Sequence, residues 1–384
     1  MYVASTETTE MNSTISTLSI ERFRSLRSLK LSGLGRVNLI TGKNNTGKSS
    51  VLEALRILAS DASPAVLANI VRYREEDFGR EDETNGSLKS EDLTHLGGLF
   101  SGFPAFSEIR EPIVLSANGG SHSMQLNISV GQYIEQRDPD GVRRLIPKQS
   151  DLFPDTDPVP ALVVEAGATR RVVRLSFLRR LVRTNEGREE GSDDPRLPCV
   201  FVGPSGGERT DNLGPLWDKI ALSDREKEIV EALRIIAPDI VAVSMVGGGG
   251  FRQRRTAITR SLNFPRPVPL RSFGDGLNRL FGIVLSLVNA QGGLLLIDEF
   301  ENGLHHTVQS EVWNGIFRLA NLMNVQVFAT SHSWDAVQAF QKAAANNADQ
   351  GVLIRLTSKE SQIIPTYFRE DELAVATREN IEVR

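Results

Sequence analysis

A glycine-rich octapeptide constrains the fold of this chain more than any other stretch of its sequence. Residues 42–49 read Gly-Lys-Asn-Asn-Thr-Gly-Lys-Ser, after an apolar stretch at 36–41 and before a stretch at 49–60 with apolar residues at helical spacing. The octapeptide matches G-x-x-x-x-G-K-[ST], in which a strand, a turn and a helix arrange backbone N–H groups around phosphate oxygens. A chance glycine turn would lack these flanks. The sequence therefore predicts an α/β fold with a nucleotide-phosphate site at the end of a strand.

The positions of this phosphate loop have distinct predicted tasks. Gly42 and Gly47 let the backbone turn inward, Lys48 neutralises charge on the β- and γ-phosphates, and the hydroxyl of Ser49 binds Mg²⁺. Lys48 is also a predicted catalytic residue, and ATP and Mg²⁺ are the predicted cofactors. The predicted nucleotide-binding residues of the loop are Gly42, Asn44, Asn45, Thr46, Gly47, Lys48, Ser49 and Ser50.

A second feature is an apolar tetrapeptide that ends in two acids. Residues 294–297 are apolar at every position, which is typical of a strand buried on both faces in a parallel sheet. Asp298 and Glu299 follow, and ligands bind at the carboxyl ends of such strands. Asp298 is therefore predicted to hold Mg²⁺, and Glu299 to polarise the attacking water. The alternative is a solvated acidic turn, which the presence of a phosphate loop in the same chain disfavours. The second acid, directly after Asp298, favours hydrolysis over nucleotide binding alone.

These motifs resemble those of the RecF/SMC-like and OLD (overcoming lysogenisation defect) ABC-type ATPases. The resemblance is carried by GKNNTGKSS with Asn44, by IERFRS at residues 20–25, and by IDEFENGLHH at residues 297–306. It is specific over about residues 17–60 and 270–384 and loose between them. It implies an ABC-type head with antiparallel N-terminal strands, a central mostly parallel sheet flanked by helices, and an inserted α+β lobe.

The resemblance also implies residues that complete the site. Ser272 and Gly274, in Ser-Phe-Gly-Asp-Gly, take the place of the family's signature, which caps the γ-phosphate bound by the other protomer, although the wording departs from LSGGQ. His332 resembles the switch histidine that contacts the γ-phosphate and the attacking water, and residues 301–305 take the place of the D-loop, which crosses the dimer. A simple helix start and a structural histidine are the alternatives. No Q-loop glutamine can be placed.

The predicted organisation has three parts. Residues 1–16 form a disordered leader, 17–75 and 265–384 form the ATPase core, and 76–264 form the inserted lobe. Strands are expected in the lobe at 113–115, 124–130, 161–165 and 172–177, with a helix at 223–237. After residue 274 we expect helices at 275–289, 307–322 and 334–347, and strands at 294–297, 325–330, 351–356 and 361–367.

Composition excludes several classes of protein. The single cysteine, Cys199, excludes a disulfide framework and a cysteine-rich metal site. The N-terminus lacks a signal peptide, and no apolar run is long enough to span a bilayer, so the predicted location is cytoplasmic, without a membrane partner. A formal net charge of −4 does not mark the whole chain as a nucleic-acid binder.

Two arginine-rich segments leave nucleic acid as a candidate partner. One lies at residues 170–183 and the other at 252–260. A DNA-facing surface is one interpretation, since arginine suits phosphate and carboxylate alike. A solvated or protomer-interface surface is favoured, because Glu186, Glu189 and Glu190 follow the first segment directly.

Chain length refines the resemblance. Lys48 and Asp298 are 250 residues apart, too close for the long arms of SMC proteins, and only 52 residues follow His332, too few for the Toprim domain of OLD nucleases. The chain thus resembles a stand-alone OLD-like ATPase of bacterial anti-phage systems such as PARIS. That implies a head-to-head dimer or higher homo-oligomer acting as sensor and scaffold for a separate effector, with a Toprim-fold nuclease as candidate. The alternatives are a RecF-like DNA-repair ATPase and a non-hydrolysing, ATP-gated assembly protein.

Overall fold

The computed structural model describes residues 14–74, 97–120, 122–137, 143–148, 158–184, 196–204, 210–247, 255–360 and 362–378. Most of the predicted leader lies outside these residues. Ile15, however, is fully buried, and its backbone N–H and carbonyl pair with the side chain of Gln326 at 2.8 and 2.7 Å. The ordered chain therefore begins before residue 17.

A six-stranded sheet forms the centre of the molecule, in the order β16-β15-β3-β14-β13-β9. Every neighbouring pair is parallel except β15 and β16, which confirms the predicted mostly parallel sheet. The strands are β3 (Val37–Gly42), β9 (Cys199–Val202), β13 (Leu294–Ile297), β14 (Gln326–Thr330), β15 (Gly351–Lys359) and β16 (Gln362–Phe368). Strand β9 joins this sheet although its residues lie within the stretch predicted as an inserted lobe.

The central strands are buried on both faces, as their continuous apolar sequences predict. In β13, Leu294 and Leu296 pack into one hydrophobic core, whereas Leu295 and Ile297 pack into the other. Successive side chains of a strand point to opposite faces, so one tetrapeptide serves two cores. This burial fixes the place where Asp298 and Glu299 leave the sheet.

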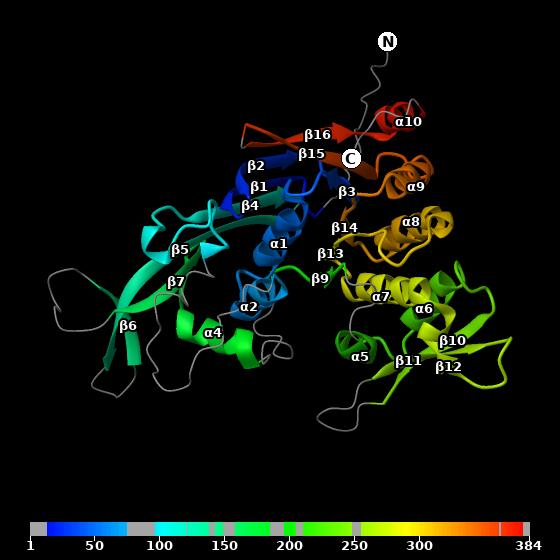
Figure 1. Ribbon diagram of the computed structural model, residues 1–384. Helices are drawn as coiled ribbons and strands as arrows, with labels where there is room; N and C mark the ends of the chain where they lie inside the picture. The colour runs from blue at the N-terminus through cyan, green and yellow to red at the C-terminus, as the bar shows by residue number, and fades with distance from the viewer. Residues whose placement is uncertain are drawn as a thin grey trace, which may run out of the picture.

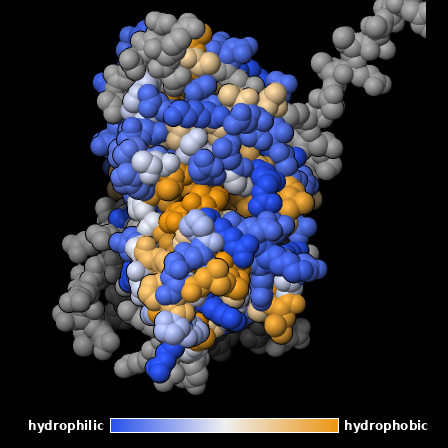
Figure 2. Space-filling model, turned by 90° about the vertical axis from the view of Figure 1, so that its right-hand side faces the viewer, coloured by the Kyte–Doolittle hydropathy of each residue, from blue (hydrophilic) through white to orange (hydrophobic). Residues whose placement is uncertain are grey.

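Helices cover both faces of the central sheet (Figure 1). One face carries α1 (Lys48–Ala59) and α2 (Pro64–Tyr73), and the other carries α7 (Asp275–Asn289), α8 (His306–Leu322), α9 (Trp334–Ala344) and α10 (Glu370–Arg378). Figure 2 looks onto the second group, whose surface is mainly hydrophilic with apolar side chains gathered near its middle. None of the helices in the described ranges is long and apolar enough to cross a membrane.

A second, seven-stranded antiparallel sheet lies beyond α1 in the order β2-β1-β4-β5-β7-β8, with β6 on β5. Its strands are β1 (Thr17–Phe23), β2 (Leu26–Ser32), β4 (Ile113–Gly119), β5 (His122–Arg137), β6 (Arg143–Pro147), β7 (Val159–Ala166) and β8 (Thr169–Arg174). The predicted N-terminal strands and the predicted lobe strands thus share one sheet. Figure 1 shows β5 and β7 reaching away from the core toward β6 and α4 (Leu175–Thr184).

A small third sheet, β10-β11-β12, lies on the opposite side of the molecule near α5 and α6 (Figure 1). The remaining elements are α5 (Thr210–Asp218), α6 (Arg225–Leu233), β10 (Ile240–Val246), β11 (Thr256–Ser261), β12 (Val268–Pro269), and short 3-10 helices at Phe106–Glu108 and Leu270–Phe273. The helix predicted at 223–237 is therefore present but shorter.

One expected strand in the lobe was wrong in detail. The strand predicted at 172–177 ends at Arg174, and α4 begins at Leu175, because Leu175, Leu178 and Leu181 recur at helical spacing and are buried. Helix α2 begins at Pro64, since proline at the first helical turn loses no hydrogen bond that the helix needs.

Candidate nucleotide-binding and catalytic site

The phosphate loop joins β3 to α1, and two of its glycines are required by its geometry. Gly42 has φ 144° and Gly47 has φ 85°, a region that side chains rarely allow. A Cβ atom on Gly42 would lie 2.4 Å from the carbonyl oxygen of Leu356, and one on Gly47 would lie 2.5 Å from the Leu26 side chain. The tight turn that the motif predicts is therefore held between β15 and β2.

The other loop residues fall into an exposed tip and a buried base. Asn44 and Asn45 are exposed, and Asn45 has a positive φ of 62°. Thr46 is buried and donates a hydrogen bond from its hydroxyl to the carbonyl of Lys43 at 2.8 Å, and Ser50 is buried at the start of α1. The tip thus lies open while the base is packed.

Lys48 lies over the loop. Its Nζ atom donates to the carbonyl oxygens of Gly42 at 2.7 Å and Lys43 at 3.1 Å. Desolvation by burial lowers the pKa of Lys48, and the negative charges of Asp298, Glu299 and Glu301 oppose that shift. The lysine therefore lies within the electrostatic reach of all three acids, although they are some 250 residues away in sequence.

Ser49 and Asp298 meet at the carboxyl end of the central sheet. The Ser49 hydroxyl donates to Asp298 Oδ1 at 3.1 Å, and Thr330 donates to the same oxygen at 2.6 Å. A hydroxyl and a carboxylate are the hard oxygen donors that Mg²⁺ prefers, and Mg²⁺ sites commonly use one or two protein oxygens plus substrate phosphates. Among the described residues, no three His, Cys, Asp or Glu side chains gather in a group that could hold a metal ion by themselves. The pair therefore fits Mg²⁺ bound together with a phosphate.

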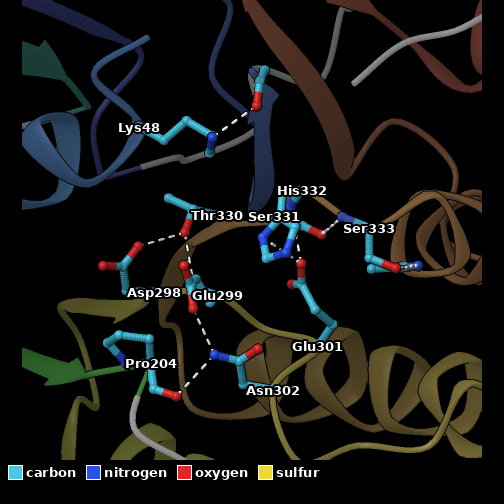
Figure 3. Close-up of polar contacts among 12 residues, drawn as sticks. Lys48, Pro204, Asp298, Glu299, Glu301, Asn302, Thr330, Ser331, His332 and Ser333 are labelled. Carbon is cyan, nitrogen blue, oxygen red and sulfur yellow. Dashed lines mark hydrogen bonds and ion pairs between the residues drawn. The ribbon is translucent and has the colours of Figure 1, made fainter. Parts of the chain in front are cut away.

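Glu299 adopts an unusual backbone conformation at the end of β13, with φ 49°. Its backbone N–H donates to the Thr330 hydroxyl at 2.9 Å, and its Oε2 accepts from Asn302 Nδ2 at 2.6 Å. Asn302 also donates to the carbonyl of Pro204 at 3.0 Å (Figure 3). A left-handed conformation in a residue other than glycine costs free energy, and it persists only where surrounding contacts offset that cost. The hydrogen bonds to Thr330 and Asn302 therefore hold Glu299 in one orientation.

Arg279 fixes the backbone of both acids from α7. It is 1% exposed, and its Nη2 donates to the carbonyls of Asp298 at 3.0 Å and Glu299 at 3.2 Å. It also donates to the carbonyl of Gly203. Because α7 begins directly after Gly274, this arginine connects the predicted signature to the acidic pair.

His332 follows Thr330 at the end of β14, as the predicted motif order places it. Its backbone N–H donates to Oε1 of Glu301 at 2.9 Å, and its Nδ1 lies 3.1 Å from the same oxygen. Figure 3 shows the imidazole of His332 turned toward Glu301, on the same side of the sheet edge as Thr330 and Glu299.

The predicted signature residues lie just before α7, whereas the phosphate loop precedes α1. Ser272 and Gly274 are exposed, and Gly274, with φ 101°, precedes the first residue of α7. Among the described residues, neither hydrogen-bonds to residues 42–49. Both residues are thus exposed at a helix start, without a hydrogen bond to their own loop in the described part of the chain.

Four residues near the acids were not assigned individual roles from the sequence. Thr330 and Arg279 act through hydrogen bonds to residues 32 and 19 positions away, and Asn302 holds Glu299. Burial first, and then the charges of Asp298 and Glu299, raise the pKa of Tyr73 to about 12. Thr330 could have been found from the sequence, because it ends a predicted buried strand two residues before the predicted histidine.

Three arginines of the first segment form ion pairs with acids. Ion pairs join Arg170 to Glu165 at 3.3 Å, Arg171 to Asp61 at 3.8 Å, and Arg174 to Glu135 at 3.1 Å. In the second segment Arg255 pairs with Asp218 at 2.6 Å, while Arg252 and Arg254 lie outside the described residues. Acids therefore offset several of these charges.

A family model described as "AAA domain, putative AbiEii toxin, Type IV TA system" matches residues 37–337. That span runs from β3 through the phosphate loop, the acidic pair and His332 into α9. It therefore includes every predicted site residue.

Two relatives match this chain over very different lengths. An "ATP/GTP phosphatase" of Helicobacter pylori is 24% identical over 383 residues, covering 93% of this chain and 96% of that protein. The "DNA replication and repair protein RecF" of Acinetobacter baylyi is 47% identical over only 49 residues, which are 13% of this chain and 14% of that protein.

A solved structure extends the comparison to the whole fold. The "SmcHead bound to the C-winged helix domain of ScpA" superposes with a TM-score of 0.50 at 10% identity, over 94% of this chain and 99% of that chain. At this identity the likeness concerns the fold alone. The α/β architecture with mixed sheets therefore matches that of this SMC head.

Proposed function

The chain belongs to the family described as "AAA domain, putative AbiEii toxin, Type IV TA system", and from that premise we propose that it is an ATPase that binds and hydrolyses Mg·ATP. One observation carries the proposal. Ser49 of the phosphate loop and Asp298 of the acidic pair are 249 residues apart in sequence, yet their oxygens lie 3.1 Å apart. A shared metal ion requires such a meeting of two motifs.

We propose the following roles for the residues of the site. Backbone N–H groups of residues 42–49 and the start of α1 hold the phosphates. Lys48 exchanges the loop carbonyls for the β- and γ-phosphate oxygens, and Ser49 and Asp298 would hold Mg²⁺, which would supply positive charge beside the phosphoryl group. Glu299, oriented by Asn302, polarises the attacking water, and His332 contacts the γ-phosphate side of the site. Positioning and charge stabilisation are what phosphoryl transfer requires of a protein.

A second copy of the chain completes this site in our proposal. Ser272 and Gly274 are exposed at the start of α7, where backbone N–H groups and the helix dipole attract an anion. Among the described residues, neither forms a hydrogen bond with its own phosphate loop. In a head-to-head dimer, each signature would cap the γ-phosphate held by the other copy.

The biological role that we propose is a sensor and scaffold for a separate effector in anti-phage defence, with a nuclease as the candidate effector. The solved SMC head that shares this fold is bound to a domain of a separate protein, ScpA, and this supports a second protein as the partner. The curated relative that spans nearly the whole chain is named as a phosphatase of ATP and GTP, which supports nucleotide hydrolysis as the activity behind that role.

Direct action on DNA receives less support. The RecF match is confined to a short segment, 14% of that protein, and the described arginines of residues 170–174 are paired with acids. ATP turnover that rises several-fold on adding DNA, and loses that stimulation in high salt, would favour the RecF-like alternative.

The test is phosphate release by the purified chain with Mg·ATP, beside Glu299→Gln and the exposed control Glu311→Ala. We expect Glu299→Gln to bind a fluorescent ATP analogue as wild type does, to lose at least about 100-fold in turnover, and to accumulate as an ATP-dependent dimer in light scattering. Unchanged turnover in Glu299→Gln would refute hydrolysis by this site.

A further inference from the structure

Glu301 lies just beyond the acidic pair and contacts the histidine at the end of the neighbouring strand. A single carboxylate oxygen, Oε1, accepts from the backbone N–H of His332 at 2.9 Å and lies 3.1 Å from Nδ1 of the imidazole. Figure 3 shows the two side chains facing each other. One oxygen thus holds both the backbone and the ring of His332.

The position of Glu301 is not explained by stability. Its side chain is 10% exposed, and its other oxygen, Oε2, is buried with no hydrogen-bond partner in the described part of the chain. A buried carboxylate oxygen without a donor destabilises a folded protein. A position that departs from good packing in this way, beside a candidate active site, is more consistent with a functional requirement.

The carboxylate also belongs to the electrostatic environment of the phosphate site. Its charge is among the three that act on Lys48. The turn that carries it is held by a backbone hydrogen bond from Leu304 to the Glu301 carbonyl at 3.0 Å. The turn is packed against α7, because a Cβ on Gly276 would lie 2.9 Å from the Gly303 carbonyl oxygen. Glu301 is thus anchored between the predicted signature helix and His332.

The chemistry of imidazole gives this contact a consequence. A carboxylate accepts hydrogen bonds and cannot donate them, so Nδ1 of His332 must carry the proton when the two pair. The bond that one ring nitrogen makes sets the tautomer and the orientation of the other. Nε2 is then the ring atom available to a phosphate oxygen or a water.

From these contacts we propose that Glu301 is a positioning residue, which fixes the tautomer and ring orientation of His332 so that Nε2 faces the γ-phosphate. The proposal rests on the proposed ATPase function. Glu301 acts through His332 and does not itself touch the nucleotide. Glu301 is the first residue of the D-loop segment, residues 301–305. A movement of that segment would therefore turn the imidazole of His332 and change its contact with the γ-phosphate.

Two conservative variants separate hydrogen-bond geometry from charge. Glu301→Gln keeps the length of the side chain and an accepting oxygen but removes the charge. Glu301→Asp keeps the charge but withdraws the carboxylate by about 1.5 Å, the length of one carbon–carbon bond. A positioning role predicts that the glutamine variant is the more active. A purely electrostatic role predicts the reverse order.

The experiment measures kcat and KM for Mg·ATP in wild type, both conservative variants, Glu301→Ala, His332→Ala and the double alanine variant, with Glu311→Ala as the exposed control on α8. We expect Glu301→Gln to stay within about 3-fold of wild type, and Glu301→Asp and Glu301→Ala to lose about 10- to 100-fold in kcat with KM changed less than about 2-fold. The double variant should be no slower than His332→Ala, since both changes remove one function.

A spectroscopic readout makes the test independent of turnover. In ¹⁵N-histidine spectra, His332 should be the Nδ1–H tautomer in wild type and Glu301→Gln, and a mixture of tautomers in Glu301→Ala. Losses that multiply in the double variant, a glutamine variant slower than the aspartate variant, or an unchanged tautomer in Glu301→Ala would each overturn the inference. If wild type and Glu311→Ala bind ATP but release no phosphate, the proposed function fails instead, and the tautomer alone decides the role of Glu301.

Discussion

The Thr330 hydroxyl joins the two acids of the site, and replacing it with valine tests that arrangement. Thr330 is fully buried, and its hydroxyl donates to Asp298 Oδ1 at 2.6 Å while accepting from the Glu299 N–H at 2.9 Å. Valine keeps the shape of the side chain but removes both hydrogen bonds. Thr330→Ser keeps the hydroxyl and loses one methyl group, so it is the matched control.

The expected loss of unfolding free energy follows from the two hydrogen bonds that valine removes. The bond to the carboxylate is charge-assisted and worth about 1.5–3 kcal/mol, and the bond from the backbone adds about 1 kcal/mol. Ser49 still donates to Asp298 Oδ1 in the variant, which lowers the total. We therefore expect Thr330→Val to lose about 3 kcal/mol of unfolding free energy, against about 1 kcal/mol for the lost methyl in Thr330→Ser.

Urea unfolding measures the stability of the two variants, and the Mg²⁺ concentration for half-maximal ATP turnover measures the metal site. Because Asp298 loses its orientation, that concentration should rise about 10-fold or more in Thr330→Val and stay near the wild-type value in Thr330→Ser. A valine variant as stable as the serine variant, with the same Mg²⁺ dependence, would refute the role of this hydroxyl.

Four further predictions concern single positions. Lys48→Ala should reduce ATP turnover by at least about 100-fold, because it removes charge stabilisation of the phosphoryl group; phosphate release checks this. Gly276→Ala should lower turnover about 10-fold, since its Cβ meets the Gly303 carbonyl at 2.9 Å, whereas Gly282→Ala in the same helix, with its nearest neighbour at 4.0 Å, should not. Burial raises the pKa of the Cys199 thiol to about 12, against a smaller opposing effect of Arg56, so Ellman's reagent at pH 8 should react more than about 100-fold faster after unfolding. The pKa of Tyr73 is raised from 10.0 to about 12, so the folded state keeps a proton that the unfolded state releases, and stability falls as pH rises through that window; urea titrations should show a smaller fall for Tyr73→Phe.

The parts of the site that the sequence predicted are those encoded by local patterns. The phosphate loop needs glycine where the backbone has a positive φ, and the tetrapeptide at 294–297 needs apolar residues on both faces. Such requirements leave a trace within a few neighbouring residues. The order of strands and helices after residue 274 was predictable for the same reason.

The contacts that position these residues are not local, and the sequence did not reveal them. Arg279 looks like a charged residue on a helix, yet it is buried because three backbone carbonyls surround it. Cys199–Val202 gives no sign that it pairs with β13, since register between distant strands depends on the whole core. The roles of Glu299, Ser272, Gly274 and His332 in catalysis and binding stay predictions.

The central claim is that one Mg·ATP binds between the phosphate loop and the acidic pair. A structure determined with Mg²⁺ and a non-hydrolysable ATP analogue tests it most directly. We predict the metal within about 2.1 Å of Ser49 Oγ, with Asp298 reaching it directly or through one water, and Lys48 Nζ moved from the loop carbonyls onto phosphate oxygens. A triphosphate bound away from residues 42–49, or a metal too far from Asp298 for a single bridging water, would contradict the claim.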